Sequence, residues 1–261
     1  MKNKLSSKSL VVFDLDGTLA ETKSNIKPDM SEALSRLLQE KKVAVISGGT
    51  YKQFRRQFIS NLQCPTAALK NLFLFPTNAT AFYHYHKGWK NVYFHSLSVA
   101  QKRKIRGAVK DVLKEIDYVP PKKIYGKTLD DRGSQMSYSF LGQDVVAKLG
   151  TKGVRLKEEW TKKNTPLKLK IAGMLQARLP EFESRAAGFT TIDIVKRGID
   201  KAYGLRQMEK HLHIPIKGMV FIGDALFPGG NDASVKKTGV QTIAVKGPQD
   251  TIAIIKKILK G

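Results

Sequence analysis

FDLDGTL, residues 13–19, together with the apolar run LVVF at residues 10–13, decides the fold of this chain. The run is apolar at every position and rich in β-branched residues, as is typical of a central parallel strand buried on both faces. Asp14 and Asp16 therefore follow at the C-terminal end of a strand, the edge at which open α/β sheets bind ligands. Gly17 permits a sharp turn there. The sequence thus predicts a two-carboxylate site at one edge of a parallel sheet.

Two acids separated by one residue suit phosphoryl transfer through a covalent aspartyl-phosphate. One carboxylate, Asp14, can act as the nucleophile, and the other, Asp16, can protonate the leaving oxygen. Taken alone, the same string also fits a calcium-type loop or a solvated turn. The other segments of the chain therefore have to distinguish these alternatives.

Three later segments supply partners for the acid pair. The apolar run at residues 43–46 ends in SGGT, whose Ser47 hydroxyl and backbone N–H groups can bind phosphate oxygens, although a plain glycine turn is the alternative. Lys201 opens a predicted helix that reaches residue 212 and can neutralise charge near Asp14. The apolar run at residues 219–222 leads into GDALFPGGND, residues 223–232. Asp224 and Asp14 together offer the carboxylate oxygens that Mg²⁺ prefers.

These four segments, in this order, resemble the motifs of the haloacid dehalogenase superfamily of phosphatases and phosphomutases. The resemblance implies that Asp14 is the nucleophile, that Asp16 is the general acid and base, and that both of them bind Mg²⁺ together with Asp224. It also implies roles for five further residues. Ser47, Gly48 and Lys201 bind phosphate, and Asn231 and Asp232 hold metal-bound water or orient Lys201.

The resemblance also implies the fold and the domain organisation. We expect an α/β Rossmann-like three-layer sandwich with a mainly parallel sheet, formed by residues 1–90 and 188–261. Between them, residues 91–187 change to amphipathic patterns, which favours an inserted α+β cap domain of the C2B type (subfamily IIB). Within this segment, one helix is predicted to begin near Thr165 and Pro166, since proline is tolerated in the first turn.

The segments IDIVKRGIDK at 192–201 and PGGND at 228–232 resemble the phosphomannomutase branch of the superfamily. In that branch, cap and hinge residues contact the substrate, and the matching positions are Arg132, Gln143, Thr191 and Asp193. A mutase needs a second anion clamp, best built from arginine. Gln143 stands where an arginine is expected, and an arginine expected near Gly150 has no match. A phosphatase acting on a small phosphorylated sugar is therefore the leading hypothesis. Phosphomannomutase-type conversion of mannose 6-phosphate to mannose 1-phosphate is the alternative.

Composition supplies a hypothesis of another class. The 261 residues hold 46 Lys and Arg against 22 Asp and Glu, a formal net charge of +24. Such a field attracts anions, so a non-catalytic nucleic-acid-binding protein is the third hypothesis. The basic residues are spread along the chain without a nucleic-acid-binding motif, which makes nucleic acid an unlikely partner. No apolar run is long enough for a membrane span, and the single cysteine fits a reducing compartment. We expect a cytoplasmic protein without a membrane partner, and a homodimer through the cap is compatible with the resemblance.

Overall fold

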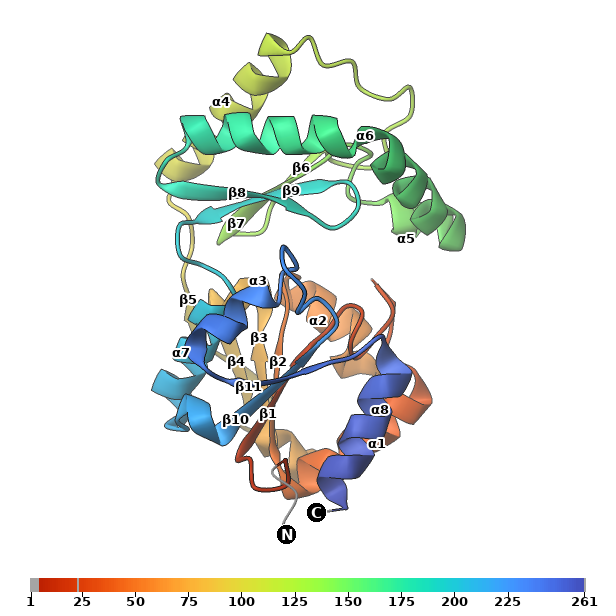
Figure 1. Ribbon diagram of the computed structural model, residues 1–261, viewed down its shortest axis with the longest axis vertical. Coiled ribbons are helices and arrows are strands. Elements are labelled where there is room, and N and C mark those ends of the chain that lie inside the picture. The colour runs from red at the N-terminus through yellow and green to blue at the C-terminus, as the bar shows by residue number, and fades with distance from the viewer. Residues whose placement is uncertain (1–4, 23, 261) are drawn as a thin grey trace. The chain divides into compact units, whose positions relative to one another are not determined.

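The chain forms two compact units, each built on its own β-sheet (Figure 1). The computed structural model describes residues 5–22 and 24–260. The first unit comprises the described residues of Met1–Phe94 and Ile199–Gly261, and the second comprises His95–Gly198. None of the described helices combines the length and the apolar composition that a membrane span requires.

The first unit contains a seven-stranded sheet in the order β11-β10-β1-β2-β3-β4-β5. The strands from β11 to β3 pair in parallel, whereas β4 and β5 add an antiparallel hairpin at one edge. The strands are β1 (Leu10–Asp14), β2 (Lys42–Ile46), β3 (Leu72–Phe75), β4 (Ala81–Tyr85), β5 (Trp89–Phe94), β10 (Met219–Gly223) and β11 (Gln241–Ala244). β1 and β10 are buried at every residue, as expected for strands that are covered on both faces.

Helices cover both faces of this sheet, so the first unit has three layers. The helices of this unit are α1 (Pro28–Glu40), α2 (Tyr51–Gln57), α3 (Pro76–Ala79), α7 (Lys201–Leu212) and α8 (Pro248–Leu259), with 3₁₀ turns at Ile59–Asn61, Thr66–Asn71, Ile216–Gly218 and Ala233–Thr238. Val11 and Phe13 of β1 pack in one core with residues of α1, α2 and α8. Leu10 and Val12 point the other way and pack with residues of α7. The predicted α/β sandwich with a mainly parallel sheet is confirmed.

The second unit contains a four-stranded antiparallel sheet in the order β6-β7-β9-β8. Its strands are β6 (Leu129–Asp131), β7 (Gln135–Ser139), β8 (Phe182–Ala187) and β9 (Thr191–Lys196), and its helices are α4 (Val99–Glu115), α5 (Val145–Leu149) and α6 (Thr151–Arg178). One face of the sheet packs against α4 and α6 around Met136, Ile192 and Ile194. The antiparallel sheet and the helices together form the additional α+β module.

The boundary between the units differs from the predicted one. A boundary at residue 187 assigns β9 to the parallel core, because its apolar pattern also suits a buried strand. In the structure, β9 pairs with β7 and β8 and is a central strand of the second sheet. The second unit therefore extends to Gly198.

The helix predicted to begin at Thr165 and Pro166 is also placed differently. Pro166 lies inside α6, which runs without interruption through Thr151–Arg178. Proline removes the hydrogen bond that the carbonyl of Lys162 would accept. Packing on both sides of the proline offsets that loss, since Trp160 stacks on Phe140 and Ile171 is buried in the core of this unit. Tertiary contacts therefore override the local helix-start signal.

Candidate active site

The acids predicted to share a site come together because three neighbouring parallel strands end at the same edge. β1 ends at Asp14, β10 ends immediately before Asp224, and β2 ends immediately before Ser47. These strands are adjacent in the order β10-β1-β2. The carboxyl ends of parallel strands lie on one side of a sheet, where α/β proteins bind their ligands. Residues more than 200 positions apart thereby contribute to one site.

Lys201 bridges two buried carboxylates in this site. Its Nζ lies 2.7 Å from Oδ1 of Asp14 and donates a hydrogen bond to Oδ1 of Asp232. The three side chains are between 0% and 3% exposed. Asp200 caps the helix by accepting a hydrogen bond from the backbone N–H of Tyr203 at 2.8 Å, so Lys201 stands at the first position of α7. The lysine is therefore fixed between the acids rather than exposed on the helix.

Burial dominates the electrostatics of these groups. It raises the pKa of Asp14 to about 7, although the ammonium of Lys201 opposes the rise. Burial alone would favour the neutral amine of Lys201, but Asp14 and Asp232 outweigh it and hold the lysine pKa above its ordinary value. Lys201 is consequently a permanent cation. Asp14 is the carboxylate whose charge state responds to a neighbouring cation or to pH.

Asp224 is held by the turn that follows the first acid pair. The hydroxyl of Thr18 donates to Oδ1 of Asp224 at 3.3 Å and accepts from the Asp224 backbone N–H at 3.1 Å. Gly17 has φ of +83°, and a Cβ at this position would lie only 2.4 Å from Oδ2 of Asp224. Both observations require glycine here, because a side chain would be strained and would displace the acid. Burial raises the pKa of Asp224 as well.

The acidic cluster fits a divalent cation. Asp14, Asp224 and Asp232 each offer one carboxylate oxygen, and these oxygens lie within 4.8 Å of one another. Asp232 is already committed, since Oδ1 accepts from Lys201 and Oδ2 accepts from the Ala225 backbone N–H at 3.1 Å. Asp14 and Asp224 each keep an oxygen without a hydrogen-bond partner in residues 5–22 and 24–260. Oxygen ligands of this kind, few in number and close together, suit Mg²⁺.

Hydrogen bonds from the segment that follows β3 hold the predicted phosphate-binding loop. Ser47 is buried, and its Oγ accepts from the Gly49 backbone N–H at 3.1 Å. Thr77 and Asn78 adopt left-handed backbone conformations, with φ of +50° and +54°. Their N–H groups donate to the carbonyls of Gly49 and Ser47 at 2.8 and 2.9 Å. Strained residues of this kind persist where surrounding contacts hold them and concentrate at functional sites.

The sequence predicts a role for Asn231 but gives no indication of Gln53. Asn231 is exposed and makes no hydrogen bond with the described part of the chain, so its predicted role at the metal-bound water stays a prediction. Gln53 was not predicted, yet its Nε2 donates to Oδ2 of Asp16 at 3.3 Å. No sequence signal identifies Gln53, because a glutamine in the first turn of a helix is ordinary.

The four predicted substrate residues of the second unit lie on or beside one polar face of its sheet. Oδ1 of Asp193 accepts from the Ser137 hydroxyl at 2.6 Å, and Nε2 of Gln143 donates to the Ser137 carbonyl at 3.0 Å. Arg132 donates to Asp130 at 3.2 Å and to Gln143 at 3.4 Å. Thr191, two residues before Asp193 on β9, donates to the Ala187 carbonyl. The structure therefore links Arg132, Gln143 and Asp193 into one network.

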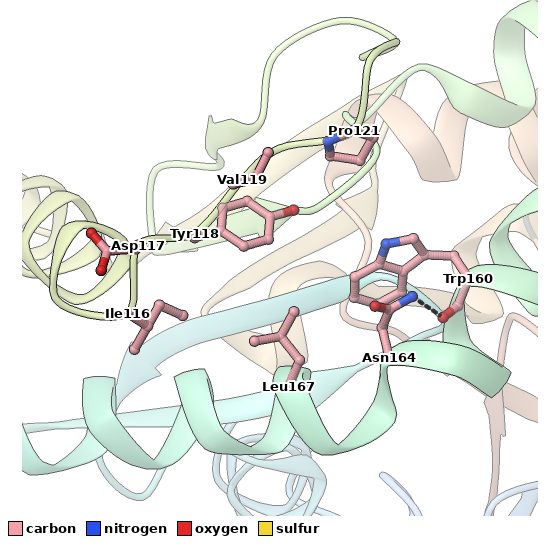
Figure 2. Close-up of a pocket in the computed structure, with 8 residues that line it drawn as sticks. All are labelled: Ile116, Asp117, Tyr118, Val119, Pro121, Trp160, Asn164 and Leu167. Carbon is pink, nitrogen blue, oxygen red and sulfur yellow. Dashed lines mark hydrogen bonds between the residues drawn. The ribbon is translucent and has the colours of Figure 1, made fainter.

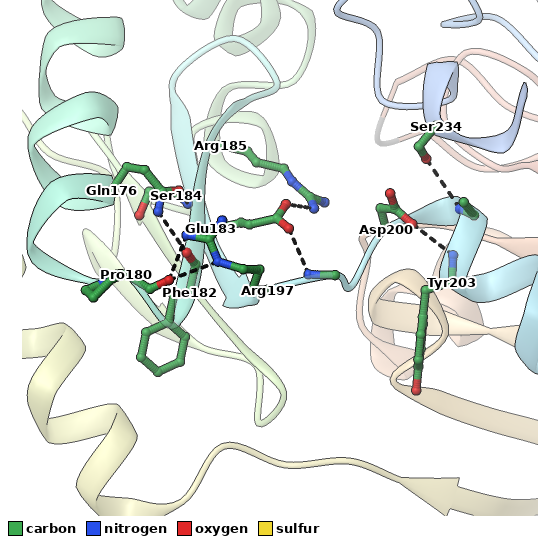
Figure 3. A network of polar contacts seen from close by, with 12 residues as sticks. Gln176, Pro180, Phe182, Glu183, Ser184, Arg185, Arg197, Asp200, Tyr203 and Ser234 are labelled. Atoms are coloured by element: carbon green, nitrogen blue, oxygen red, sulfur yellow. Dashed lines mark hydrogen bonds and ion pairs between the residues drawn. The ribbon is translucent and has the colours of Figure 1, made fainter. Parts of the chain in front are cut away.

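A second polar network fixes the end of the second unit (Figure 3). The carboxylate of Glu183 accepts from the guanidinium of Arg185 and from the Gly198 backbone N–H at 2.7 Å. Arg197 donates twice to the carbonyl of Pro180. These contacts hold the chain against β8 up to Gly198, the last residue of this unit.

The second unit also contains a cavity of about 380 Å³ beside α6 (Figure 2). Tyr118, Trp160 and Asn164 contribute polar atoms to its wall, and Ile116, Val119, Pro121 and Leu167 contribute apolar surface. Asp117 is the one charged residue of the wall. The cavity contains none of the predicted site residues.

Comparison with known proteins identifies the class. The sequence model of the haloacid dehalogenase-like hydrolases matches residues 11–240, and the chain belongs to this family. The predicted superfamily, and with it the prediction of an enzyme, is confirmed.

Relatives that match nearly the whole chain carry the name phosphomannomutase. The chain is 24% identical over 269 residues to a probable phosphomannomutase of Caenorhabditis elegans, covering 100% of this chain and 99% of that protein. It is 27% identical to a phosphomannomutase of Drosophila melanogaster, covering 96% and 95%.

Solved structures share the fold. An IMP-nucleotidase of Plasmodium falciparum matches with a TM-score of 0.70 at 15% identity, covering 98% of this chain and 63% of that one. A Streptococcus mutans protein, SMU.1108c, matches with a TM-score of 0.64 at 16% identity, covering 98% and 100%.

Proposed function

We propose that this chain is a Mg²⁺-dependent phosphatase that hydrolyses a small phosphorylated sugar through an aspartyl-phosphate. One observation carries the proposal: Lys201 bridges buried Asp14 and Asp232 at a sheet edge that also holds Asp224. A nucleophilic carboxylate, a fixed cation and a pair of unpartnered carboxylate oxygens are the parts that phosphoryl transfer requires.

The reaction proceeds in two displacements. An oxygen of Asp14 attacks phosphorus, the ester P–O bond breaks, and Asp16 donates a proton to the leaving sugar oxygen. Asp16, now a carboxylate, accepts a proton from water as that water attacks phosphorus. The bond between phosphorus and Asp14 then breaks, which releases inorganic phosphate and restores both acids.

The remaining residues position the phosphate and balance its charge. Lys201 stabilises the negative charge that develops on the phosphoryl oxygens, and Asp232 keeps the lysine in place. Ser47 and Gly48 offer donors to the phosphate. Mg²⁺, held by Asp14, Asp224 and the backbone carbonyl of Asp16, would neutralise phosphate charge and orient the substrate. The contacts of Asp232 support lysine orientation over the alternative of holding metal-bound water.

The second unit serves in this proposal as the cap that contacts the sugar, through Arg132, Gln143, Thr191 and Asp193. The contacts of Arg132 support hydrolysis over mutase activity. Its guanidinium already bonds to Asp130 and to Gln143, and its side chain is 14% exposed. A clamp for a second phosphate needs an uncommitted cation. A cytoplasmic location and a homodimer through the cap stay predictions.

Phosphomannomutase activity is the second candidate, because the relatives that match nearly the whole chain carry that name. Such an enzyme would interconvert mannose 6-phosphate and mannose 1-phosphate and would depend on a bisphosphorylated sugar as activator. Its first step uses the same residues, so the two candidates differ in whether water or a sugar hydroxyl accepts the phosphoryl group.

The test measures phosphate release and isomer exchange side by side on a panel of sugar phosphates with Mg²⁺. We expect release without exchange. Exchange without release would favour the mutase and contradict our first choice. Asp14→Asn is expected to abolish both activities, since the amide is not a nucleophile, and activity that survives it would eliminate the covalent mechanism.

A further inference from the structure

The cavity beside α6 belongs to the second unit alone, because its whole wall lies between Ile116 and Leu167 (Figure 2). One side of the wall is the chain that follows α4. The other is α6, on which Trp160, Asn164 and Leu167 stand four and three positions apart and therefore share one face. A volume of about 380 Å³ and a mostly apolar wall with a few polar atoms are typical of small-molecule sites.

Two aromatic rings line the cavity, and a third ring supports both. Trp160 stacks on Phe140 with the ring centroids 4.6 Å apart, and Tyr118 meets Phe140 edge-on at 5.7 Å. Phe140 is buried in the core of this unit, so the two lining rings are held in place. A ligand that binds against them does not have to order them first. Aromatic faces of this kind attract cations as well as apolar groups.

The end of α4 fixes the other side of the cavity. The backbone N–H of Asp117 donates to the carbonyl of Lys114 at 3.1 Å, and that of Tyr118 donates to the carbonyl of Leu113 at 2.9 Å, the two bonds of a Schellman motif. Asp117 occupies the left-handed position of this motif, with φ of +46°, where glycine is the usual residue. Strain of this kind concentrates at functional sites. A carboxylate therefore stands where the backbone by itself favours glycine.

Two acceptors of the wall are left for a ligand. Nδ2 of Asn164 donates to the Trp160 carbonyl at 2.8 Å, which fixes the amide and leaves Oδ1 without a partner among the described residues. Asp117 forms no ion pair within residues 5–22 and 24–260, although the chain has 46 Lys and Arg for 22 Asp and Glu. It is also the one charged residue of the wall. An anion would meet a carboxylate and no cation in this wall, whereas a cation would meet its counter-charge.

We propose that this cavity binds a small organic cation with a planar apolar body, of the aryl amidine or aryl ammonium class. The planar body lies against Tyr118 and Trp160, and the cationic N–H groups donate to the carboxylate of Asp117 and to Oδ1 of Asn164. Asp117 is exposed, so the charged end of the ligand keeps part of its hydration. The site goes beyond the phosphatase reaction and uses none of its residues.

Three probes of nearly the same shape separate charge from shape. Benzamidine, benzamide and benzoate share a phenyl ring and carry a cationic, a neutral and an anionic group. The emission of Trp160 in a Trp89→Phe background reports on the wall itself, since the chain has two tryptophans. We expect benzamidine to change this emission with a Kd of about 1 mM or lower, as suits a ligand of its size. Benzamide and benzoate should bind at least about 10-fold more weakly, because they lose the charge-assisted bond.

Asp117→Gly separates a binding role from a structural one. Glycine relieves the left-handed strain, so the melting temperature should equal or exceed that of the wild type. The Kd of benzamidine should nevertheless rise about 10-fold or more, to the level of benzamide. Asp111→Asn is the matched control, since Asp111 is an exposed acid of α4 outside the wall, and it should leave the Kd within about twofold. If Asp117→Gly does not fold, Asp117→Asn carries the same test, because asparagine tolerates this conformation.

The outcomes are decisive in both directions. Equal affinities for the three probes, or unchanged benzamidine binding in Asp117→Gly, would overturn the proposal. Trp160 emission that stays constant with benzamidine about tenfold above the expected Kd would overturn it as well. The phosphatase is tested independently, since Asp14→Asn should lose activity and still bind benzamidine as the wild type does.

Discussion

Removal of the buried lysine tests the electrostatic core of the site. In the wild type, Nζ of Lys201 lies 2.7 Å from Oδ1 of Asp14 and donates a hydrogen bond to Oδ1 of Asp232. Lys201→Met removes this cation from both carboxylates. Breaking a buried ion pair by deleting one partner costs about 3–5 kcal/mol, because the remaining charge is buried without compensation. We expect a loss of this size in the free energy of unfolding at pH 8, without metal.

The loss has a defined dependence on pH. Burial already raises the pKa of Asp14 from 3.8 to about 7 with the lysine present. A carboxyl whose folded pKa is raised loses folded-state stability as pH rises from its unfolded pKa to its folded pKa. Without Lys201 the folded pKa rises further, so the variant continues to lose stability above pH 7 where the wild type levels off. The difference between the two proteins should therefore grow from pH 7 to 8, by at most about 1.4 kcal/mol per unit.

The assay uses the position of the two tryptophans. Trp89 lies in β5 of the first unit and Trp160 in α6 of the second. In a Trp160→Phe background, urea unfolding followed by fluorescence in EDTA reports on the first unit alone. Unfolding curves of the wild type and of Lys201→Met at pH 6, 7 and 8 give the difference in their free energies of unfolding and the change of that difference with pH.

Lys168→Met is the matched control. Lys168 is also buried, but within residues 5–22 and 24–260 its Nζ donates to two backbone carbonyls, those of Gly188 and Phe189 at 3.0 and 3.1 Å, and to no carboxylate. In a Trp89→Phe background its cost should be about 1–3 kcal/mol and constant between pH 6 and 8, since no carboxylate is left behind. A second variant, Lys201→Met with Asp232→Asn, should recover part of the loss. A cost below about 1 kcal/mol for Lys201→Met, or no growth with pH, would refute the reasoning.

Three further predictions concern the metal, the core and a helix end. Protons compete with Mg²⁺ for Asp14, whose pKa is raised to about 7, so the increase in melting temperature on adding Mg²⁺ should be larger at pH 8 than at pH 6; an equal increase would place the ion elsewhere. Gln57→Met removes a fully buried amide without a partner among the described residues and should raise the free energy of unfolding by about 1–2 kcal/mol in urea titrations. His213 ends α7 with φ of +53° and is exposed, so His213→Gly should stabilise by about 1 kcal/mol, whereas His213→Ala should not.

The fold could be predicted because its signals are local and strong. A parallel strand covered on both faces must be apolar at every position, and the runs before Asp14 and Asp224 meet that requirement. Because such strands align at one edge, the meeting of the acids follows from topology alone. Pro166 and β9 were misplaced for the opposite reason. Whether a helix continues through Pro166, and which sheet β9 joins, depends on packing partners that lie elsewhere in the chain.

The sequence predicts which charged groups form the site, but it does not predict how their side chains are oriented. The sequence allows Asp232 either to hold metal-bound water or to orient Lys201. The choice depends on where each of its carboxylate oxygens points, and residue spacing does not give that direction. Gln53 illustrates the same limit more sharply. Its contact with Asp16 requires the cap at Thr50, the missing side chain of Gly49 and a particular rotamer to act together. A sequence motif records which acids are present. The orientation of those acids depends on where their neighbours place hydrogen-bond donors, as Lys201 does for Asp14 and Gln53 for Asp16, and no motif specifies these positions.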